Sequence, residues 1–397
     1  MGKIIMRELR LILSDSGAML ILLFAMLIYT IIYSTAYGSE VAQSIDIAVV
    51  DGDKTPTSST LVEGLRSGPN TRVAYEVNSI SQAKQLFFER KIYGIVVIPN
   101  GLERDLLSSR GVTIGLILDG DHLLLYSKVF EQSVSDALTQ AAEVEVGSLV
   151  ARGVDDITAV NIAEPVKFSE TILYNSSLGY GSFVMPSIVV VIIQQTLLIG
   201  VAMVSMRRRR EQQLTWVDAI KIVVARDIVY VAIYLVEFVI IMLTVWQVFG
   251  FPMNGNVLNI LVLMVLYIFA SVNLAEVLSG LFKRREAPII MLLWSSVPIL
   301  LLAGVSYPRE AFPEWLYAIG RLMPSSSAVD GFIRLNSMGA PLSSVKNELL
   351  TLLILSIGYG AVALLCCRLS ATSLSSLSSL SSLGSLVILG RERPERR

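Results

Sequence analysis

Side chains that could carry chemistry are few in this sequence, and they are scattered along it. The densest group is Asp119-Gly120-Asp121-His122, in which two carboxylates and an imidazole could ligate a metal ion. No further acidic residue follows at the spacing of a calcium-binding loop. A turn after a strand uses the same residue types for its backbone geometry. We therefore interpret this group as a turn.

Metal, nucleotide and nucleic-acid chemistry find little support elsewhere. The chain has one histidine and two cysteines, the adjacent Cys366 and Cys367, which are too few for a His/Cys metal centre. A Gly-x-x-x-x-Gly-Lys-Ser/Thr loop, which would cradle the phosphates of ATP, does not occur. The 32 basic and 33 acidic residues leave a net charge of −1, which gives no field that favours nucleic acid. We expect a chain without catalytic residues, metal or bound cofactor.

A second set of polar side chains lies inside long apolar segments. Glu237 is near the middle of one of them, where a carboxylate costs at least ~2.5–3.5 kcal/mol and must be protonated, paired or turned toward water. Each such residue either lines a transport pathway or hydrogen-bonds between packed helices, and the sequence leaves both open. The candidates are Gln194, Gln195, Glu237, Asn273 and Glu276.

The elements that hold these residues are membrane spans. Hydrophobic residues make up 53% of the chain and charged residues 16%, against about 45–50% and about 25% in soluble domains. Six segments of roughly 20 residues carry almost no charge, and each is long enough to cross a hydrocarbon core of about 30 Å. We predict a polytopic α-helical membrane protein with six transmembrane helices. The segments are 18–36, 183–206, 222–249, 257–282, 288–306 and 349–367.

The distribution of basic residues predicts the orientation of the spans. With the N-terminus inside, the short inner segments hold most of the lysines and arginines, whereas the short outer loops keep only four of them. The four are Arg309, Arg321, Arg334 and Lys346. Both termini are therefore expected in the cytoplasm.

The apolar run of the first span is too long for a cleaved signal peptide, and no small-x-small site closes it, so we expect a retained anchor. Residues 1–17 either form an interfacial helix or are a charged flank of that anchor.

The segment 39–180 has the pattern of an inserted α/β domain outside the membrane. Apolar runs at 45–50, 92–98 and 112–118 predict strands, and the first ends in the turn residues Asp51-Gly52-Asp53. Helical patterns at 81–90, 102–109 and 123–150 follow or separate them, with Ser81 as an expected cap. Strands that alternate with helices indicate a small sheet covered by helices.

Two further segments stand apart from the spans. The outer segment 305–347 is rich in prolines and apolar residues, which indicates either a re-entrant or interfacial helix that narrows an exit, or an amphipathic loop on the surface. Its marker residues are Tyr307, Pro308, Pro313, Trp315 and Pro324. The tail 368–397 repeats leucine every third residue from 374 to 386, a period that fits no stable helix face. We expect this cytoplasmic tail to be disordered.

The order of these motifs resembles a known family. The run Ile47-Ala-Val-Val-Asp-Gly-Asp53, the run 93–99, Leu173-Tyr-Asn175, and the prolines around Trp315 resemble permeases of the ABC-2 type. The likeness is to the branch with one span, a large extracytoplasmic domain and five more spans. This chain departs from that branch at Ser176, where proline is usual, and after 207–211, where a Gly-Thr pair is missing.

The resemblance implies a function and partners. It implies the membrane half of an ATP-driven exporter of hydrophobic or amphipathic compounds in the inner membrane, with ATP and Mg²⁺ held by separate ATPase subunits. A second permease, identical or paralogous, and a periplasmic adaptor are the further partners. The implied ATPase-coupling residues are Arg7, Arg208, Arg209, Arg210 and Glu211. The alternative is a non-transporting membrane anchor whose outer domain is a binding or scaffolding module.

Overall fold

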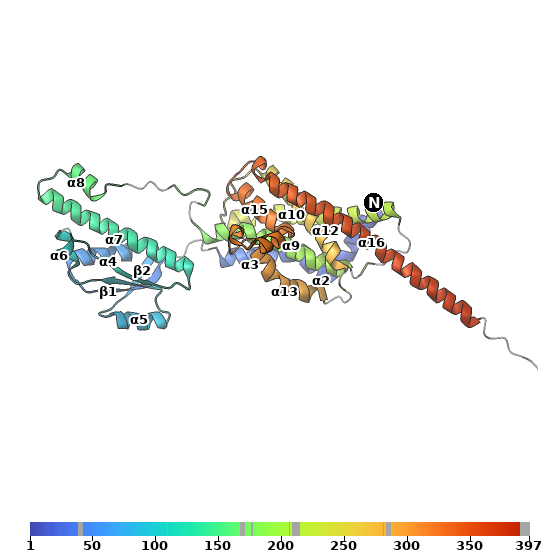
Figure 1. Cartoon of the computed structure of the whole chain (residues 1–397), viewed down its shortest axis with the longest axis horizontal. Coiled ribbons are helices and arrows are strands. Elements are labelled where there is room, and N and C mark those ends of the chain that lie inside the picture. The colour runs from blue at the N-terminus through green and yellow to red at the C-terminus, as the bar shows by residue number, and fades with distance from the viewer. Residues whose placement is uncertain are drawn as a thin grey trace, which may run out of the picture. The chain divides into compact units, whose positions relative to one another are not determined.

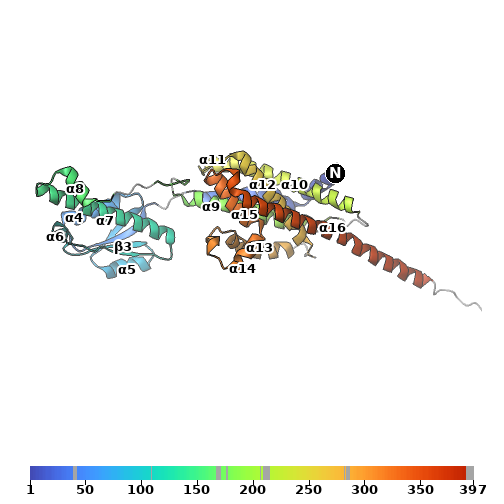
Figure 2. The same cartoon turned by 45° about the horizontal axis from the view of Figure 1, so that its top comes forward.

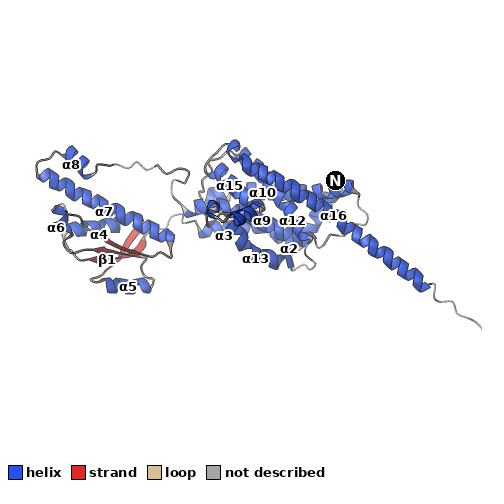
Figure 3. Cartoon of the chain, viewed as in Figure 1, coloured by secondary structure: helices blue, strands red, loops and turns tan. Residues whose placement is uncertain are grey.

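The computed structural model describes the chain in two compact units (Figures 1 and 3). Unit 1 comprises Met1–Glu40 and Ile172–Arg397, and unit 2 comprises Val41–Thr171. The structure describes residues 1–38, 43–108, 110–166, 171–175, 178–205, 207–208, 215–280, 282 and 287–389.

Unit 1 is helical in its described part (Figure 3). Several of its helices are apolar and longer than 20 residues, and shorter helices and short π and 3-10 turns lie between them. The elements are α1 (Gly2–Leu13), α2 (Ser16–Met19), η1 (Leu20–Ala25), α3 (Met26–Ala36), α9 (Tyr180–Ser205), α10 (Trp216–Leu243), α11 (Val245–Val248), α12 (Val257–Ser279), α13 (Ala287–Leu302), η2 (Arg309–Ala311), α14 (Glu314–Arg321), α15 (Pro324–Phe332), η3 (Ile333–Ser337), η4 (Leu342–Val345) and α16 (Lys346–Leu389).

Five helical stretches in the described residues are long and apolar enough to cross a membrane. They are Ser16–Ala36, Tyr180–Ser205, Trp216–Val248, Val257–Ser279 and Leu342–Arg368. The segment 288–306, which we expected to be a further span, contains α13 with 16 residues. At 1.5 Å per residue that helix is about 24 Å long, short of the roughly 30 Å of a hydrocarbon core. The structure therefore supports a polytopic membrane protein with five of the six expected spans.

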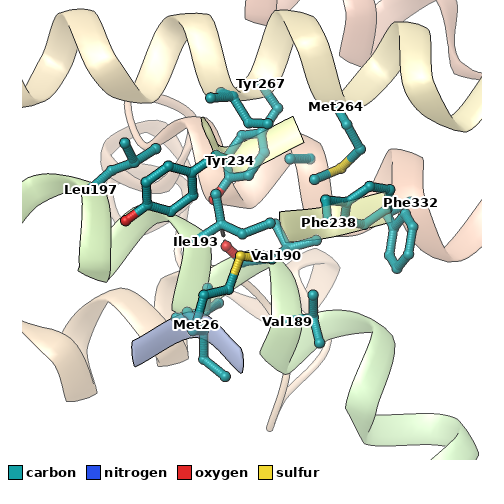
Figure 4. Packing of buried hydrophobic residues seen from close by; sticks show 14 of the residues in the cluster. Met26, Val189, Val190, Ile193, Leu197, Tyr234, Phe238, Met264, Tyr267 and Phe332 are labelled. Atoms are coloured by element: carbon teal, nitrogen blue, oxygen red, sulfur yellow. Dashed lines mark hydrogen bonds between the residues drawn. The ribbon is translucent and has the colours of Figure 1, made fainter. Parts of the chain in front are cut away.

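Helix α9 is the centre of unit 1. Its sequence is apolar on every side, which is typical of a helix surrounded by others. In its most hydrophobic stretch of 18 residues, 89% is buried. It packs against α3, α12, α13 and α15. Figure 4 shows Val190 and Ile193 of α9 near the rings of Tyr234 and Tyr267, and the ring of Phe332 beside that of Phe238. The apolar core of the unit lies around this helix.

The first span packs on α9 through one row of residues. Ala18, Leu22, Met26, Thr30 and Ser34 are buried at every fourth position, while most of the side chains between them are exposed. The span begins where the Asp15 carboxylate accepts hydrogen bonds from the N–H groups of Gly17 and Ala18, which satisfies donors that a helix start leaves open.

Unit 2 is a four-stranded sheet between helices (Figures 1 and 2). The strand order is β2-β1-β3-β4; β1 runs parallel to β2 and β3, and β4 is antiparallel to β3. The strands are β1 (Ile45–Asp51), β2 (Thr71–Glu76), β3 (Gly94–Ile98) and β4 (Gly115–Leu118), and the helices are α4 (Pro56–Ser67), α5 (Ile80–Phe88), α6 (Leu102–Leu107), α7 (Leu123–Ala151) and α8 (Asp156–Ala163).

The two-residue period of β1 divides the core of unit 2 into two layers. Ile47 and Val49 pack on the side of α4 and α7, whereas Ala48 and Val50 pack on the side of α5. Sequence patterning found β1, β3, β4, α5, α6 and α7, although β4 is shorter than expected. It missed α4, β2 and α8, and the cap of α5 is Ser79 rather than Ser81.

The group at Asp119 is a turn, as interpreted from the sequence. Asp119 Oδ1 accepts a hydrogen bond from the N–H of Asp121 at 3.0 Å, and its Oδ2 lies 2.7 Å from Nδ1 of His122. Both carboxylate oxygens therefore organise the step from β4 into α7, whose N-cap is His122.

The C-terminal tail differs from expectation. Helix α16 has 44 residues and continues through the Ser/Leu repeat to Leu389, whereas the period of three predicted disorder. Serine and leucine are both compatible with a helix that has already been nucleated, and elongation needs no further nucleation step. This explains how α16 extends beyond its apolar part. The last part of the predicted tail, 390–397, lies outside the described residues.

Candidate functional site

A buried cluster of charged side chains lies where four segments of unit 1 meet. Arg208 follows α9 directly, Glu8 lies on α1, and Glu276 lies near the end of α12. Arg226 and Tyr230 lie one turn apart on α10, up to its middle. We call these five residues the ion-pair cluster.

Arg208 is the centre of the ion-pair cluster. Its Nε donates to Oε1 of Glu8 at 3.0 Å, and its Nη1 lies 2.7 Å from the carboxylate of Glu276. The side chains of Arg208 and Glu276 are 8% and 7% exposed. One guanidinium thus bridges two carboxylates from different helices, a use for which its planar fork of donors is well suited.

Arg226 and Tyr230 complete the cluster from α10. The Tyr230 hydroxyl donates to Oε1 of Glu8 at 2.8 Å, and Arg226 Nη1 lies 3.4 Å from Oε2 of Glu276. Two carboxylates therefore face two guanidinium groups. Because breaking a buried pair leaves an uncompensated charge, removal of one partner typically costs about 3–5 kcal/mol.

The cluster fixes the ionisation of Glu8. Burial raises the pKa of this carboxyl, but the charge and hydrogen bonds of Arg208, with Arg226 and Tyr230, outweigh it and hold the pKa below its ordinary value. For Arg208, burial lowers the pKa, but the carboxylates of Glu276 and Glu8 raise it well above its ordinary value. Both groups are charged at neutral pH.

The neighbouring arginine ties the same connection to the start of the first span. Arg207 Nη1 donates to the carbonyl of Ser14 at 3.1 Å and lies 3.3 Å from the Asp15 carboxylate. The segment after α9 is therefore joined to α1, to the α1–α2 turn, to α10 and to α12.

The structure brings together residues that the sequence had placed in different sets. Arg208, a coupling candidate, pairs with Glu276, a candidate for a polar group within the spans. Arg7 is exposed on α1. The predicted positions outside the described residues are Ser176, Arg209, Arg210 and Glu211.

Sequence reasoning missed Glu8, Arg226 and Tyr230. For Glu8 a signal existed. It lies three residues after Ile5 and four before Ile12, so a helix places it on the same face as these apolar side chains. Glu8 and Ile12 are both buried. An acidic residue on the apolar face of an interfacial helix predicts a buried partner.

The remaining polar candidates separate into partnered and unpartnered groups. Gln194 Oε1 accepts the Ser325 N–H of α15 at 2.8 Å, and Asn273 Nδ2 donates to the carbonyl of Phe269 at 3.0 Å. The buried side-chain atoms of Gln195 and Glu237 have no hydrogen-bond partner in the described part of the chain. Gln194 therefore joins helices, whereas Gln195 and Glu237 do not.

Two short α-helices of the segment 305–347, α14 and α15, differ in character. Pro308, Pro313 and Pro324 stand directly before or at the first residue of η2, α14 and α15, where a missing N–H costs nothing. Helix α15 is almost wholly buried and contacts α9, α12 and α16. On α14, in contrast, Trp315 is 65% exposed.

Two side-chain contacts hold the beginning of this segment. The rings of Tyr307 and Phe312 stack with centroids 6.0 Å apart. Arg309 pairs with Asp330 of α15, so the loop before α14 is fastened to the buried helix. The arrangement combines a buried helix with an exposed amphipathic one.

Comparison with known proteins decides the family. A model described as ABC-2 family transporter protein matches residues 17–365. The chain belongs to the ABC-2 transporter family. The match spans the first span, unit 2 and the helices through the apolar part of α16, so the family likeness covers the elements that form the ion-pair cluster, except α1.

Relatives of this ABC-2 chain are permeases. It is 24% identical over 382 residues to "Probable multidrug ABC transporter permease YbhR" of Escherichia coli (strain K12), covering 91% of this chain and 96% of the relative. It is 22% identical over 374 residues to "Inner membrane transport permease YhhJ" of the same strain, covering 90% and 94%. No solved structure matches the chain. The ABC-2 chain is a membrane permease subunit, and among its described residues no group of three His, Cys, Asp or Glu side chains could hold a metal ion.

Proposed function

We propose that this permease subunit works in an exporter that moves hydrophobic or amphipathic compounds out of the cytoplasm or the inner leaflet, driven by separate ATPase subunits that hold ATP and Mg²⁺. The observation that carries the proposal is the ion-pair cluster. It joins α1 and the segment after α9, which lie at the ends of spans, to α10 and α12, which are spans.

The cluster supplies a physical route from the ATPase to the spans. Subunits that bind α1 and the 207–221 connection would push on Arg208 when they close around ATP. Arg208 is bonded to Glu8 and Glu276, and breaking a buried ion pair has a high free-energy cost. The helices α1, α10 and α12 would therefore move with Arg208. Two discrete packings of these helices would then give inward-open and outward-open states.

The same contacts support a cytoplasmic location for both termini. They join α1 to the end of α12 and to Arg226 and Tyr230 of α10, and Arg368 of α16 lies 4.0 Å over the ring of Trp216 at the start of α10. These elements adjoin the basic connections that the positive-inside rule assigns to the cytoplasm. Unit 2 would then lie outside the membrane, where it could gate the exit or receive a periplasmic adaptor.

Export and dimer formation rest on different support. Export follows from the resemblance of the sequence and agrees with the word multidrug in the name of one relative. For a second permease, α13 offers an apolar face, since Leu293, Trp294 and Val297 are all more than half exposed. In the alternative function, a non-transporting anchor, α1 and the connection after α9 would bind no ATPase.

The test is co-expression with an ATPase encoded beside the gene. We expect the two chains to purify together and the ATPase to hydrolyse ATP faster with the permease in nanodiscs. Arg208→Lys keeps the charge but loses the fork that bridges two carboxylates, so it should abolish this acceleration without preventing folding. Arg321→Gln, at an exposed position of α14, should keep it. Failure to associate, or full acceleration with Arg208→Lys, would contradict the proposal.

A further inference from the structure

Glu237 lies at the edge of the buried face of α10, beyond the ion-pair cluster, and the residue is partly exposed. Arg226, Tyr230, Tyr234 and Glu237 follow one another at spacings of three or four residues, so the helix places them in one row. The first two bond to Glu276 and Glu8, respectively. Glu237 is about 10 Å farther along the helix axis than Tyr230, inside the Trp216–Val248 span.

The hydrogen-bonding capacity of Glu237 is unused. Both of its carboxylate oxygens are buried and have no hydrogen-bond partner in the part of the chain that the structure describes, and the same holds for the hydroxyl of Tyr234 one turn earlier. Glu8 and Glu276, in contrast, each have an arginine partner. A carboxylate in a membrane span requires a counter-charge, a proton or water, and the described chain provides Glu237 with no counter-charge.

Aromatic residues precede and follow Glu237 on α10. Tyr234 and Phe238, which flank Glu237 on α10, lie in the core shown in Figure 4. The Phe238 ring packs edge-on against Phe332 with centroids 5.8 Å apart, and the ring centroid of Trp246 lies 6.4 Å from that of Phe332. Aromatic faces attract cations and also accommodate apolar groups.

From this combination we propose that Glu237 is a binding group for a hydrophobic organic cation, namely a lipophilic amine in its protonated form. The ammonium group donates N–H hydrogen bonds to the Glu237 carboxylate and to the Tyr234 oxygen, and the apolar part of the ligand packs on the aromatic residues. A metal ion fits poorly, because the described residues contain no group of acidic side chains that could complete its coordination. The inference rests on the proposed export function and specifies the charge of its substrate.

The test is equilibrium binding to the full chain in nanodiscs of zwitterionic lipid at pH 7. The two probes are radiolabelled dodecylamine, which is protonated at this pH, and 1-dodecanol, which is neutral. Binding is measured against empty nanodiscs, because both probes enter the bilayer. The variants are Glu237→Gln, which keeps the shape without the charge, Glu237→Asp, which keeps the charge, and Glu314→Gln, which removes a carboxylate of α14.

We expect Glu237→Gln to weaken amine binding by about 10- to 100-fold, the loss of one charge-assisted hydrogen bond. Dodecanol binding should not change in any variant. Glu237→Asp should retain part of the amine affinity, and Glu314→Gln all of it. Equal amine binding by the wild type and by Glu237→Gln, or no amine binding above empty nanodiscs, would overturn the proposal and leave Glu237 a structural residue.

Binding is measured without the ATPase, so its outcome is independent of the exporter test. If the chain accelerates its ATPase but does not bind the amine, the proposed function stands and this inference is wrong. If the chain binds the amine through Glu237 but does not associate with an ATPase, the proposed function is wrong and the binding inference stands.

Discussion

The hydroxyl of Tyr230 on α10 donates to Oε1 of Glu8 on α1 across 2.8 Å, although the two residues are 222 positions apart. The same Glu8 oxygen accepts from Arg208, which in turn pairs with Glu276 on α12. A helix that precedes the first span is thereby joined to two later spans through one carboxylate. Glu8 is the residue on which the ion-pair cluster can be tested most directly.

Substitution at Glu8 should destabilise the protein more than substitution at Tyr230. Glu8→Gln leaves the buried Arg208 with one carboxylate fewer and should cost about 3–5 kcal/mol of unfolding free energy. Tyr230→Phe removes one hydrogen bond to a charged group and should cost about 1.5–3 kcal/mol. Denaturant unfolding in micelles measures both. A Glu8→Gln variant as stable as the wild type would mean that the ion pairs do not hold α1.

The lowered pKa of Glu8 predicts an acid-sensitive stability. Because the folded state holds the Glu8 pKa below its ordinary value of 4.5, the unfolded state binds the proton more readily. The contribution of Glu8 to stability is therefore complete above about pH 4.5 and is lost as the pH falls through the folded pKa. Thermal melts from neutral pH down through this acidic window should show the loss, and Glu8→Gln should show a shallower pH dependence over the same window.

Gln194 should control the order of α15. Gln194→Leu leaves the buried N–H of Ser325 without its acceptor, which should cost about 1–3 kcal/mol, and hydrogen exchange across 324–332 should accelerate. Gln195→Leu is the matched control, because its amide atoms have no described partner to lose. Equal exchange in both variants would show that the Gln194–Ser325 hydrogen bond does not order this helix.

The crossing of the first span and α9 should depend on Gly200. A Cβ atom at Gly200 would overlap Cδ2 and Cγ of Leu22, so Gly200→Ala should destabilise the protein by about 1–3 kcal/mol through overpacking. Leu22→Ala makes room for the added methyl group. The double variant should therefore be more stable than the sum of the two single changes predicts, and a double-mutant cycle of unfolding free energies measures this coupling. Strictly additive effects would argue against the close contact.

Local patterns were sufficient for much of the fold. Each span is a run of apolar residues whose length can be compared with the thickness of the bilayer. The strand at Ile45–Asp51 ends in residue types that favour a turn whatever the tertiary structure around them. The missed strand β2 and helix α4 have weaker patterns. Thr71–Glu76 lies at the edge of the sheet with most of its side chains exposed, so it lacks the apolar alternation that reveals a strand.

The sequence by itself determined that this is a multi-pass membrane protein and which polar residues lie within its apolar segments, because hydrophobicity and its period are properties of neighbouring residues. The tertiary structure decided which of those polar residues are paired. Arg208 meets Glu8 and Glu276 only after α1, α9 and α12 have packed together, and Glu237 has no partner among the described residues because the same packing places no cation beside it. The contacts of the ion-pair cluster join residues as far as 222 positions apart, and no local pattern records such distances.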